Sequence, residues 1–380
     1  MHKAVRICHV TSVHKNTSVR ILKKECESLA KDQRYEVFEI GNGESFKEGD
    51  VRVIGVSCKR ASRLYRFFIY SRQVAKKALE LNADIYHLHD PELLLSVKLL
   101  SSRGAKVIFD SHENILESID EKTYMPKLVR KIAKLFYYIL QKKVLPKVDG
   151  IIVVTPKTRA AYECYNDNIT VVTNYPIIKY KGLNNYNRNN TFIFAGGISR
   201  QWSHNEIISA IAHIDDIEYK LYGNGSSEYI TELKAISNFK NVSYGGVISF
   251  DEVQAEIENA GYSIALLKPS KNTHGMEGTL GNTKLFEAMS HGKPVIATNF
   301  SLWKDIVEEY NCGICVDPNN VEEISKAINK LLSMSDEEYY QMSKNCIYAV
   351  IEHYSWDVTK KNLFELYERI LEEKQCNLET

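Results

Sequence analysis

The chain has 380 residues, of which 44% are hydrophobic and 26% are charged. This composition is typical of a globular protein, and the length allows two domains with sizeable cores. The sequence contains no apolar run of about 18 residues, which excludes a membrane-spanning helix. The eight cysteines are scattered, which argues against a disulfide framework and fits a reducing cytoplasm.

The two halves of the chain carry opposite charges. Residues 1–190 hold 33 Lys and Arg against 20 Asp and Glu, a net charge of +13. The remaining residues hold 16 against 28, a net charge of −12. A basic first half favours an anionic partner, such as a membrane surface, a phospholipid or a phosphorylated substrate.

In chain order, the first half alternates strand-like and helix-like segments. Strands are expected at residues 5–10, 35–40, 51–56, 84–88, 105–109, 150–154 and 169–172. Helical patterns occupy residues 18–30, 64–81 and 92–101, a long stretch after Pro126, and the segment after residue 154. Strands that alternate with helices at this spacing predict a parallel, doubly wound sheet.

A polar, asparagine-rich stretch, 179-KYKGLNNYNRNN-190, is expected to be a linker because it has no periodicity. A second series follows it. Strands are expected at residues 191–195, 218–222, 242–244, 263–267, 295–298 and 313–316, with helices between them and two helices closing the chain. The sequence therefore predicts two doubly wound, Rossmann-like domains, at residues 1–180 and 191–355.

In open α/β sheets, ligands bind beyond the carboxyl ends of the strands. Five such strand ends carry polar or glycine-rich sequences: 87-HLHDPELL-94, 109-FDSHENI-115, 194-FAGGISRQWSH-204, 221-LYGNGS-226 and 271-KNTHGMEGTLGNTKLFE-287. Glycine lets the backbone approach a ligand closely, and free N–H groups attract anions. One such turn is weak support for a site, but five on two doubly wound halves favour two domains facing a cleft.

These motifs together resemble the GT-B glycosyltransferases of family 4, the group 1 enzymes of polysaccharide and glycolipid assembly. The most specific piece is 285-LFEAMSHGKPVIATN-299, and 354-YSWDVTKKNLFELYERIL-371 resembles the family's closing helix. The resemblance implies that the second domain binds a nucleotide diphosphate sugar and that the first binds the acceptor. It also implies that a final helix, residues 356–380, packs back on the first domain.

The resemblance assigns roles to residues of the second domain. Glu287 is expected to accept hydrogen bonds from the ribose, because a carboxylate offers two acceptor oxygens to a vicinal diol. Its apolar neighbours make the alternative, a solvent-exposed helix glutamate, less favoured. Lys284 is expected to face the diphosphate and to act catalytically. The other implied donor-binding residues are Asn282, Thr283, Gly281, Glu277, Gly196, Gly197 and Gly223.

The sequence departs from the family pattern at three positions. Thr279 stands where relatives usually carry a second glutamate, and Gly197 and Trp202 stand where many carry Arg and Lys. Arg200 is then the best candidate for a second catalytic cation on the departing diphosphate. The sequence has no DxD motif, and 87-HLHD-90 has a single carboxylate, so we expect neither a metal nor a cofactor.

In the first domain, the resemblance places His112 near the donor sugar and the acceptor, where an imidazole can relay a proton. Capping of the following helix is the alternative role for His112. Asp110 and Glu113 are expected to orient its ring. His89 and Asp90 are weaker acceptor-site candidates, because Asp90, Pro91 and Glu92 also form an ordinary helix start.

Two basic segments, residues 59–77 and 127–147, each combine seven cations with apolar or aromatic residues. Basic amphipathic helices bind anionic lipid, so peripheral membrane contact is one expectation. The alternative is an ordinary apolar face packed on the core beneath a solvated basic face. Nucleic acid is disfavoured because the segments lack a recognition motif and the second half is acidic.

We therefore expect a cytoplasmic, retaining, metal-independent glycosyltransferase that extends a glycan or a lipid-linked acceptor, in contact with the inner face of the cell membrane if the basic segments bind lipid. Two alternatives stay open. One is a nucleotide-sugar 2-epimerase of the same fold. The other is a non-catalytic GT-B subunit that binds a partner transferase. The identity of the sugar, base, acceptor and linkage depends on loop shapes that residue types do not fix.

Overall fold

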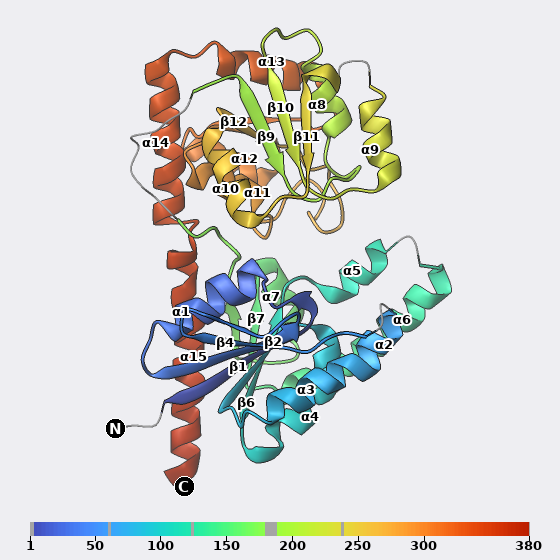
Figure 1. Ribbon diagram of the computed structural model, residues 1–380, viewed down its shortest axis with the longest axis vertical. Helices are drawn as coiled ribbons and strands as arrows, with labels where there is room; N and C mark the ends of the chain where they lie inside the picture. The colour runs from blue at the N-terminus through green and yellow to red at the C-terminus, as the bar shows by residue number, and fades with distance from the viewer. Residues whose placement is uncertain (1–3, 60–61, 123–124, 179–187, 237–238, 380) are drawn as a thin grey trace. The chain divides into compact units, whose positions relative to one another are not determined.

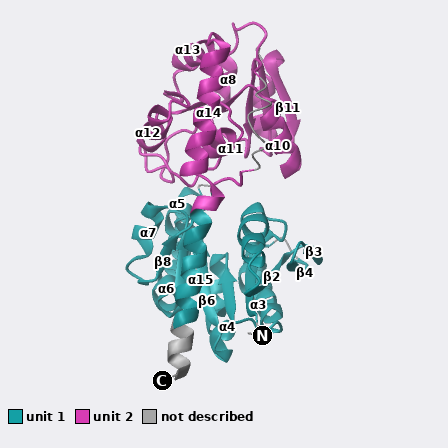
Figure 2. Cartoon of the chain, turned by 90° about the vertical axis from the view of Figure 1, so that its left-hand side faces the viewer, with its two compact units in different colours: residues 1–174, 359–380 teal, residues 175–358 magenta. Residues whose placement is uncertain are grey.

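The protein forms two compact α/β units (Figure 2). The structure is a computed structural model that describes residues 4–59, 62–122, 125–178, 188–236 and 239–379, with residues 373–379 described by their backbone alone. Unit 1 comprises Met1–Asn174 and Thr359–Thr380, and unit 2 comprises Tyr175–Val358. The boundary therefore precedes residue 180, and most of the expected linker, residues 179–187, lies outside the described residues.

Unit 1 is built on an eight-stranded sheet with the order β3-β4-β2-β1-β5-β6-β7-β8 (Figure 1). Its strands are β1 (Val5–Lys15), β2 (Tyr35–Asn42), β3 (Phe46–Glu48), β4 (Val51–Gly55), β5 (Ile85–Leu88), β6 (Lys106–Ser111), β7 (Gly150–Val153) and β8 (Ile169–Val171). All neighbours are parallel except β3, which runs antiparallel to β4. The predicted parallel sheet is confirmed, while the edge strand β3 was not predicted.

The central strands of unit 1 are short and mostly apolar in sequence because helices cover both faces of the sheet. All residues of β5 and β7 are buried, as expected for parallel strands between two layers of helices. The helical segments are η1 (Val19–Cys26), α1 (Glu27–Ala30), α2 (Arg63–Tyr65), η2 (Arg66–Tyr70), α3 (Ser71–Leu79), η3 (Pro91–Ser96), α4 (Val97–Leu100), η4 (Ser101–Arg103), α5 (Ile115–Glu121), α6 (Lys127–Val144), η5 (Leu145–Lys147) and α7 (Pro156–Tyr162).

Three predicted helices of unit 1 have a different local form. The helix expected at residues 18–30 is mainly the π-helical segment η1, and the helix expected at 64–81 contains the π-helical segment η2 between α2 and α3. The helix expected at 92–101 is divided into η3, α4 and η4. π-Helical turns are rare and frequently accompany functional sites. η1 buries three charged side chains, those of Arg20, Lys24 and Glu25, and two of them belong to the cluster described below.

Unit 2 contains a six-stranded sheet with the order β11-β10-β9-β12-β13-β14, in which every pair is parallel. Its strands are β9 (Thr191–Ala195), β10 (Glu218–Tyr222), β11 (Val242–Gly246), β12 (Tyr262–Ala265), β13 (Val295–Thr298) and β14 (Gly313–Val316). The strand order reverses between β9 and β12, as it does between β1 and β5 in unit 1. The carboxyl ends at such switch points are the usual ligand positions.

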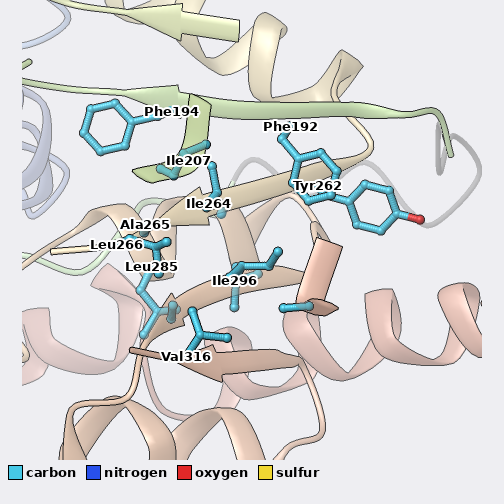
Figure 3. Close-up of a cluster of buried hydrophobic side chains, with 14 of the residues drawn as sticks. Phe192, Phe194, Ile207, Tyr262, Ile264, Ala265, Leu266, Leu285, Ile296 and Val316 are labelled. Carbon is cyan, nitrogen blue, oxygen red and sulfur yellow. The ribbon is translucent and has the colours of Figure 1, made fainter. Parts of the chain in front are cut away.

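The core of unit 2 surrounds β9 and β12 (Figure 3). Phe192 of β9 stacks on Tyr262 of β12 with ring centroids 4.8 Å apart, and Leu285 is fully buried in the same cluster. The helical segments are α8 (His204–Ala210), α9 (Ser227–Lys234), η7 (Phe239–Asn241), α10 (Phe250–Asn259), α11 (Lys284–Ser290), α12 (Ser301–Glu309), α13 (Val321–Leu332) and α14 (Asp336–Glu352).

Three helices, not the predicted two, close the chain: α13, α14 and α15 (Trp356–Glu379). α14 begins anew because Ser335 and Glu338 form a capping box, which satisfies its first backbone donors. From Thr359 onward α15 belongs to unit 1, where Thr173 N–H donates to Thr359 Oγ1 at 3.0 Å. Across the described ranges, every helix falls short of the length or hydrophobicity that crossing a membrane requires.

Candidate functional site

The switch point of unit 2 carries a pocket of about 300 Å³. It lies beyond the carboxyl ends of β9 and β10 and beside the first turn of α11. The lining residues are Ala195, Gly196, Gly197, Tyr222, Gly223, Asn224, Val247, Ile248, Phe250, Val253, Gln254, Lys284 and Glu287. Of the residues predicted from the sequence, the pocket thus brings together three glycines, the lysine and the acid.

Two of these glycines are required by close backbone contacts. Gly223 has φ +137°, and a Cβ there would lie 1.7 Å from the carbonyl oxygen of Gly196. A Cβ on Gly196 would lie 2.7 Å from Cε of Lys284. Gly197 is exposed, and a Cβ there would meet nothing within 4 Å among the described residues. The first two glycines therefore form a close-packed floor that leaves room for the lysine side chain.

Lys284 and Glu287 form an ion pair at the wall of this pocket. Lys284 Nζ lies 3.0 Å from Glu287 Oε2, and the two side chains are 26% and 20% exposed. The backbone N–H of Lys284 donates to Asn282 Oδ1 at 3.1 Å, which fixes the turn before α11. A cation and a carboxylate thus stand side by side and half-buried, where a polar ligand can reach both.

The structure does not bring the other predicted donor residues to the pocket lining. Gly281, Asn282 and Thr283 form the turn before α11, and Glu277 is exposed in the preceding loop. Arg200 is exposed, pairs with Glu232 of α9 and lies over the Tyr229 ring, 5.0 Å from its centroid. In this conformation its guanidinium is directed to α9 rather than to the pocket.

Sequence reasoning named no individual residue on the apolar side of the pocket. That side comes from the segment after β11, where Val247 is 74% exposed and Phe250 39% exposed. Ile248 and Gln254 complete it. The sequence did contain a signal for this side of the pocket. Two glycines end β11, and the apolar residues that follow them do not fit a helical or strand pattern that would place them in the core.

The switch point of unit 1 holds a buried polar cluster instead of a pocket floor of glycines. β1 contributes His9, β5 contributes His87, and β6 contributes Asp110. His89 and His112 follow β5 and β6 directly. η1 supplies Arg20 and Glu25 to the same cluster, and every member except His112 is buried.

Arg20 and Asp110 form a buried ion pair with several hydrogen bonds. The Arg20 Nη2 group donates to both Asp110 oxygens, at 3.2 and 3.0 Å, and Nη1 donates to the carbonyl oxygen of Val172 at 3.2 Å. Arg20 Nε lies 3.1 Å from Glu25 Oε1. Charge-assisted, forked contacts of this kind fix both partners.

His112 lies at the accessible edge of the cluster, with its side chain 21% exposed. Its Nε2 is 3.3 Å from Asp110 Oδ2 and 3.4 Å from His89 Nδ1. The helix after it begins beyond Asn114, and no described side chain caps that helix, so the capping alternative for His112 is wrong. Asp110 contacts the ring as expected, whereas Glu113 is exposed and forms no ion pair with His112 within the described residues.

Asp90 stabilises the irregular part of β1, between its paired residues Val10 and Lys15. Its Oδ2 accepts hydrogen bonds from Thr11 Oγ1 at 2.7 Å and from the backbone N–H groups of Ser12 and Val13 at 2.6 and 3.0 Å. Pro91 does occupy the first turn of η3, but the Asp90 carboxylate does not cap that helix. Asp90 therefore stabilises β1, while His89 beside it faces the buried cluster.

Burial determines the charge states within the cluster. It lowers the pKa of His9 and His87 well below the ordinary value and the pKa of His89 to about 4. Burial and the neighbouring Asp110 raise the pKa of Glu25 well above its usual range. Burial alone would also raise the pKa of Asp110, but Arg20 and His112 outweigh it and hold that pKa low.

Four members of this cluster were not predicted: His9, Arg20, Glu25 and His87. The two histidines alternate with core residues on strands, and Arg20 and Glu25 lie within a helical pattern, so each reads locally as a structural residue. Their convergence depends on the pairing of His9 with His87 in the β1–β5 register. A weak signal was available, since three histidines follow or end neighbouring strands.

Two doubly wound parallel units, each with charged side chains at its switch point, define a protein of the two-Rossmann-domain class. Residues 178–349 match the family model described as glycosyl transferases group 1. Residues 19–175 match the model described as Glycosyltransferase Family 4. The chain belongs to these GT-B glycosyltransferases, as the sequence motifs indicated.

Two curated relatives resemble parts of the chain. An uncharacterized glycosyltransferase of Methanocaldococcus jannaschii is 27% identical over 205 residues, which are 52% of this chain and 54% of the relative. A sucrose synthase of Melioribacter roseus is 35% identical over 85 residues, which are 22% of this chain and 11% of the relative. The chain thus matches about half or less of the length of these relatives.

Solved structures share the fold over nearly the whole chain. Sucrose-phosphate synthase from Thermosynechococcus elongatus has a TM-score of 0.73 at 14% identity and covers 97% of this chain and 100% of its own. Anabaena HepE, in complex with UDP and glucose, has a TM-score of 0.69 at 13% identity, covering 96% and 100%. WaaG, a glycosyltransferase involved in lipopolysaccharide biosynthesis, has a TM-score of 0.68 at 14% identity, covering 94% and 98%.

Proposed function

We propose that this protein transfers a sugar, with retention of configuration, from a nucleotide diphosphate sugar to a glycan or a lipid-linked acceptor. The observation that carries the proposal is the Lys284–Glu287 pair, 3.0 Å apart above the floor formed by Gly196 and Gly223. It stands at the switch point of unit 2, where doubly wound sheets hold nucleotides. Transfer would need no metal ion at this pocket, because lysine supplies the positive charge.

Each side of the pocket suits one part of such a donor. The Glu287 carboxylate would accept hydrogen bonds from the ribose diol, and Lys284 Nζ would turn to the diphosphate as charge develops on it. Val247 and Phe250, which are apolar and accessible, would cover a face of the nucleobase. Anabaena HepE, which shares the fold, was solved in complex with UDP and glucose, so UDP is the first probe for this chain.

Further roles extend the proposal to the reacting atoms. His112 would relay a proton at the sugar–acceptor junction, with its ring held by Asp110 at 3.3 Å. Arg200 would have to leave Glu232 to reach the diphosphate. Glu277 and the turn at Gly281, Asn282 and Thr283 would contact the sugar once it is bound.

Calorimetry with UDP, GDP, ADP, CMP and dTDP tests the donor site. One of these nucleotides is expected to bind. Glu287→Ala is expected to lower the affinity for that nucleotide by roughly 10- to 100-fold, because hydrogen bonds to a charged group typically contribute that much. Glu256→Ala is a matched control, because Glu256 pairs with Lys220 at 2.8 Å with similar exposure outside the pocket.

Failure of every nucleotide to bind at millimolar concentration would contradict the donor site and favour a non-catalytic subunit. Donor screening by mass spectrometry then identifies the sugar. An epimerised donor formed without any acceptor would instead support the 2-epimerase alternative. Retention is checked by the anomeric configuration of the product.

A lipid-linked acceptor is favoured by one surface of unit 1. α6 exposes an apolar row whose members are Leu128, Val129, Ile132, Leu135, Phe136, Tyr138 and Ile139. Phe67 and Phe68 of η2 contact Phe136, with ring centroids 5.9 and 6.4 Å apart. The two basic segments therefore meet in one apolar, cation-rimmed surface, although residues 60 and 61 of the first lie outside the described residues.

Vesicle flotation tests this surface. The protein is expected to float with vesicles that contain anionic lipid and to stay behind with neutral ones, because each cation near the surface adds roughly 1 kcal/mol. Ile132→Glu is expected to abolish flotation. Ile351→Glu, at an apolar residue of unit 2 that is 40% exposed, is the control, and equal loss in both variants contradicts the proposed surface.

A further inference from the structure

Four buried side chains of unit 1 direct their polar atoms at one point. Glu25 Oε2 lies 3.7 Å from His9 Nδ1, 3.8 Å from His89 Nε2 and 4.0 Å from His87 Nε2. His9 Nδ1 and His89 Nε2 are 2.9 Å apart. The ligand atoms of all four residues lie within 4.8 Å of one another, so three imidazoles and one carboxylate converge inside the core.

These separations are those of a compact metal site. Zinc binds imidazole nitrogen at about 2.0–2.1 Å in tetrahedral sites, which places neighbouring ligand atoms about 3.3–3.4 Å apart. The four separations given above, from 2.9 to 4.0 Å, bracket that value, and every other pair of ligand atoms lies within 4.8 Å. Three nitrogens and one oxygen are also a ligand set that divalent first-row ions accept.

Each histidine presents its other ring nitrogen to a group that fixes the ring. His87 Nδ1 is 2.8 Å from the hydroxyl of Tyr367, and the same hydroxyl is 3.5 Å from His9 Nε2. His89 Nδ1 is 3.4 Å from the Asp110 carboxylate. Carboxylate or hydroxyl partners on the outer nitrogen are the usual second layer of a metal site, because they orient the inner lone pair.

Two of the inner atoms are poorly satisfied by the protein itself. Within the part of the chain that the structure describes, Glu25 Oε2 and His87 Nε2 are buried and have no hydrogen-bond partner. The other oxygen of Glu25, Oε1, faces Arg20 Nε instead, at 3.1 Å. Buried polar atoms without partners are costly, and a shared cation would satisfy both at once.

We propose that His9, His87, His89 and Glu25 bind a divalent first-row metal ion, with zinc as the best match to the ligand set. The site is closed by four protein ligands, which is the pattern of structural rather than catalytic zinc. It is separate from the donor pocket of unit 2 and does not depend on the proposed transfer activity. The sequence predicted no metal because 87-HLHD-90 has a single carboxylate and no DxD motif is present. In the structure that carboxylate, Asp90, binds residues of β1 instead, and the carboxylate of the cluster, Glu25, comes from η1.

Such an ion would join segments that are distant in the chain. It would tie η1 to β1 and β5 through its ligands, and α15 to the same sheet through Tyr367. It would also fix His89, whose outer nitrogen faces Asp110, which in turn contacts His112. The accessible histidine would thus be positioned from the buried ion through His89, both directly at 3.4 Å and through Asp110.

Elemental analysis of the full chain, purified from zinc-supplemented cells without a metal-affinity tag, tests the proposal directly. About one metal ion per chain is expected, as for other structural sites. Removal by a strong chelator is expected to lower the melting temperature of the protein by roughly 5–10 °C. Cobalt replacement should give the absorption bands of a four-coordinate nitrogen–oxygen site. Absence of both metal and cobalt bands overturns the proposal.

A matched pair of variants separates this site from adventitious binding. His87→Gln is expected to lose the metal. His204→Gln is expected to keep it, because His204 is an equally buried histidine whose Nδ1 is 2.9 Å from the hydroxyl of Tyr219, in unit 2. Equal metal content in the two variants overturns the proposal.

Tyr367→Phe covers the case in which His87→Gln does not fold. This variant keeps all four ligands and removes only the hydroxyl behind His87 and His9. Loss of such an outer partner typically weakens metal affinity by roughly 10- to 100-fold. Competition against a chelating dye measures the change, and an unchanged affinity overturns the arrangement.

Discussion

Units 1 and 2 place opposite kinds of site at the same topological position. At the switch point of unit 1, charged and aromatic side chains fill the space and are buried. At the switch point of unit 2, Gly196 and Gly223 keep the space open, and Lys284 and Glu287 remain a quarter to a fifth exposed. The sheet therefore decides where polar side chains gather, and residue size decides whether they form a closed network or an open pocket.

The largest expected effect comes from breaking the closed network. Asp110→Asn would remove the carboxylate that binds Arg20 through both of its oxygens and leave the buried guanidinium with Glu25 Oε1 alone beside it, and breaking a buried pair typically costs about 3–5 kcal/mol of stability. Urea unfolding of the parent chain and of the variant measures the loss of unfolding free energy. Glu36→Gln is the control, since Glu36 forms a half-exposed pair with Arg6 at 3.0 Å, and such pairs contribute about 1 kcal/mol or less. Equal losses of unfolding free energy in the two variants would show that the buried Arg20–Asp110 pair contributes no more to stability than the surface pair of Arg6 and Glu36.

Substitutions in the open pocket are expected to change the transfer rate rather than the free energy of unfolding. Lys284→Met should reduce the transfer rate by roughly 10²- to 10³-fold, the usual effect of removing one stabilising group for developing charge, with the melting temperature nearly unchanged. Arg200→Met should cost roughly threefold or less, because its guanidinium faces α9 and exposed pairs contribute little. Comparable losses would mean that Arg200 swings to the diphosphate in the bound state.

A third prediction concerns Glu39, a buried acid of unit 1. Burial raises the pKa of Glu39 from an ordinary value of 4.5 to about 8, and neither of its oxygens has a hydrogen-bond partner within the described residues. The folded state therefore retains a proton that the unfolded chain releases. The contribution of Glu39 to the free energy of unfolding is therefore constant below pH 4.5. It becomes less favourable to the folded state as the pH rises from 4.5 towards 8.

Glu39→Met removes this linkage and should stabilise the protein at pH 7 by roughly 2–3 kcal/mol. The gain should vanish near pH 4.5, so the variant's unfolding midpoint should change less between pH 5 and pH 8 than that of the parent. A constant difference across this range would refute the assignment of the raised pKa.

The smallest effect compares two adjacent glycines of the pocket. Gly196→Ala would place a methyl group 2.7 Å from Lys284 Cε, so that side chain would have to move, and we expect roughly a tenfold lower transfer rate with a stability change below about 1 kcal/mol. Gly197→Ala meets nothing within 4 Å in the described parts of the chain and should leave both quantities near the parent values. Equal rates in the two variants would argue against a fixed lysine position.

The fold was largely readable from the sequence because its strands are short β-branched runs at regular spacing. Residues 150–153 and 295–298 are clear examples, since both runs are buried on both faces. The π-helical form of η1 and the edge strand β3 were not readable. Their conformations depend on neighbours that close the turn or pair the edge, and no local pattern records those neighbours.

The two sites differ in the same respect. The pocket glycines directly follow β9 and β10, and Lys284 and Glu287 lie three residues apart at the start of α11, so the chemistry of the pocket is visible in short stretches of sequence. His9, Glu25 and His87 come from three elements, and Tyr367 lies 280 residues after His87. Only the β1–β5 register and the path of α15 bring them together, and neither is contained in a motif.

The discontinuity of unit 1 sets an order on biosynthesis. Leu366, Tyr367 and Ile370 of α15 are fully buried, and two of them contact the position of Gly150 in β7. Unit 2 is continuous in the chain and is synthesised before these residues. A ribosome therefore makes most of unit 1 first but completes it last, and until then its sheet lacks the helix that covers β7. A chain that stops before residue 359 would contain all of unit 2 and an unfinished unit 1.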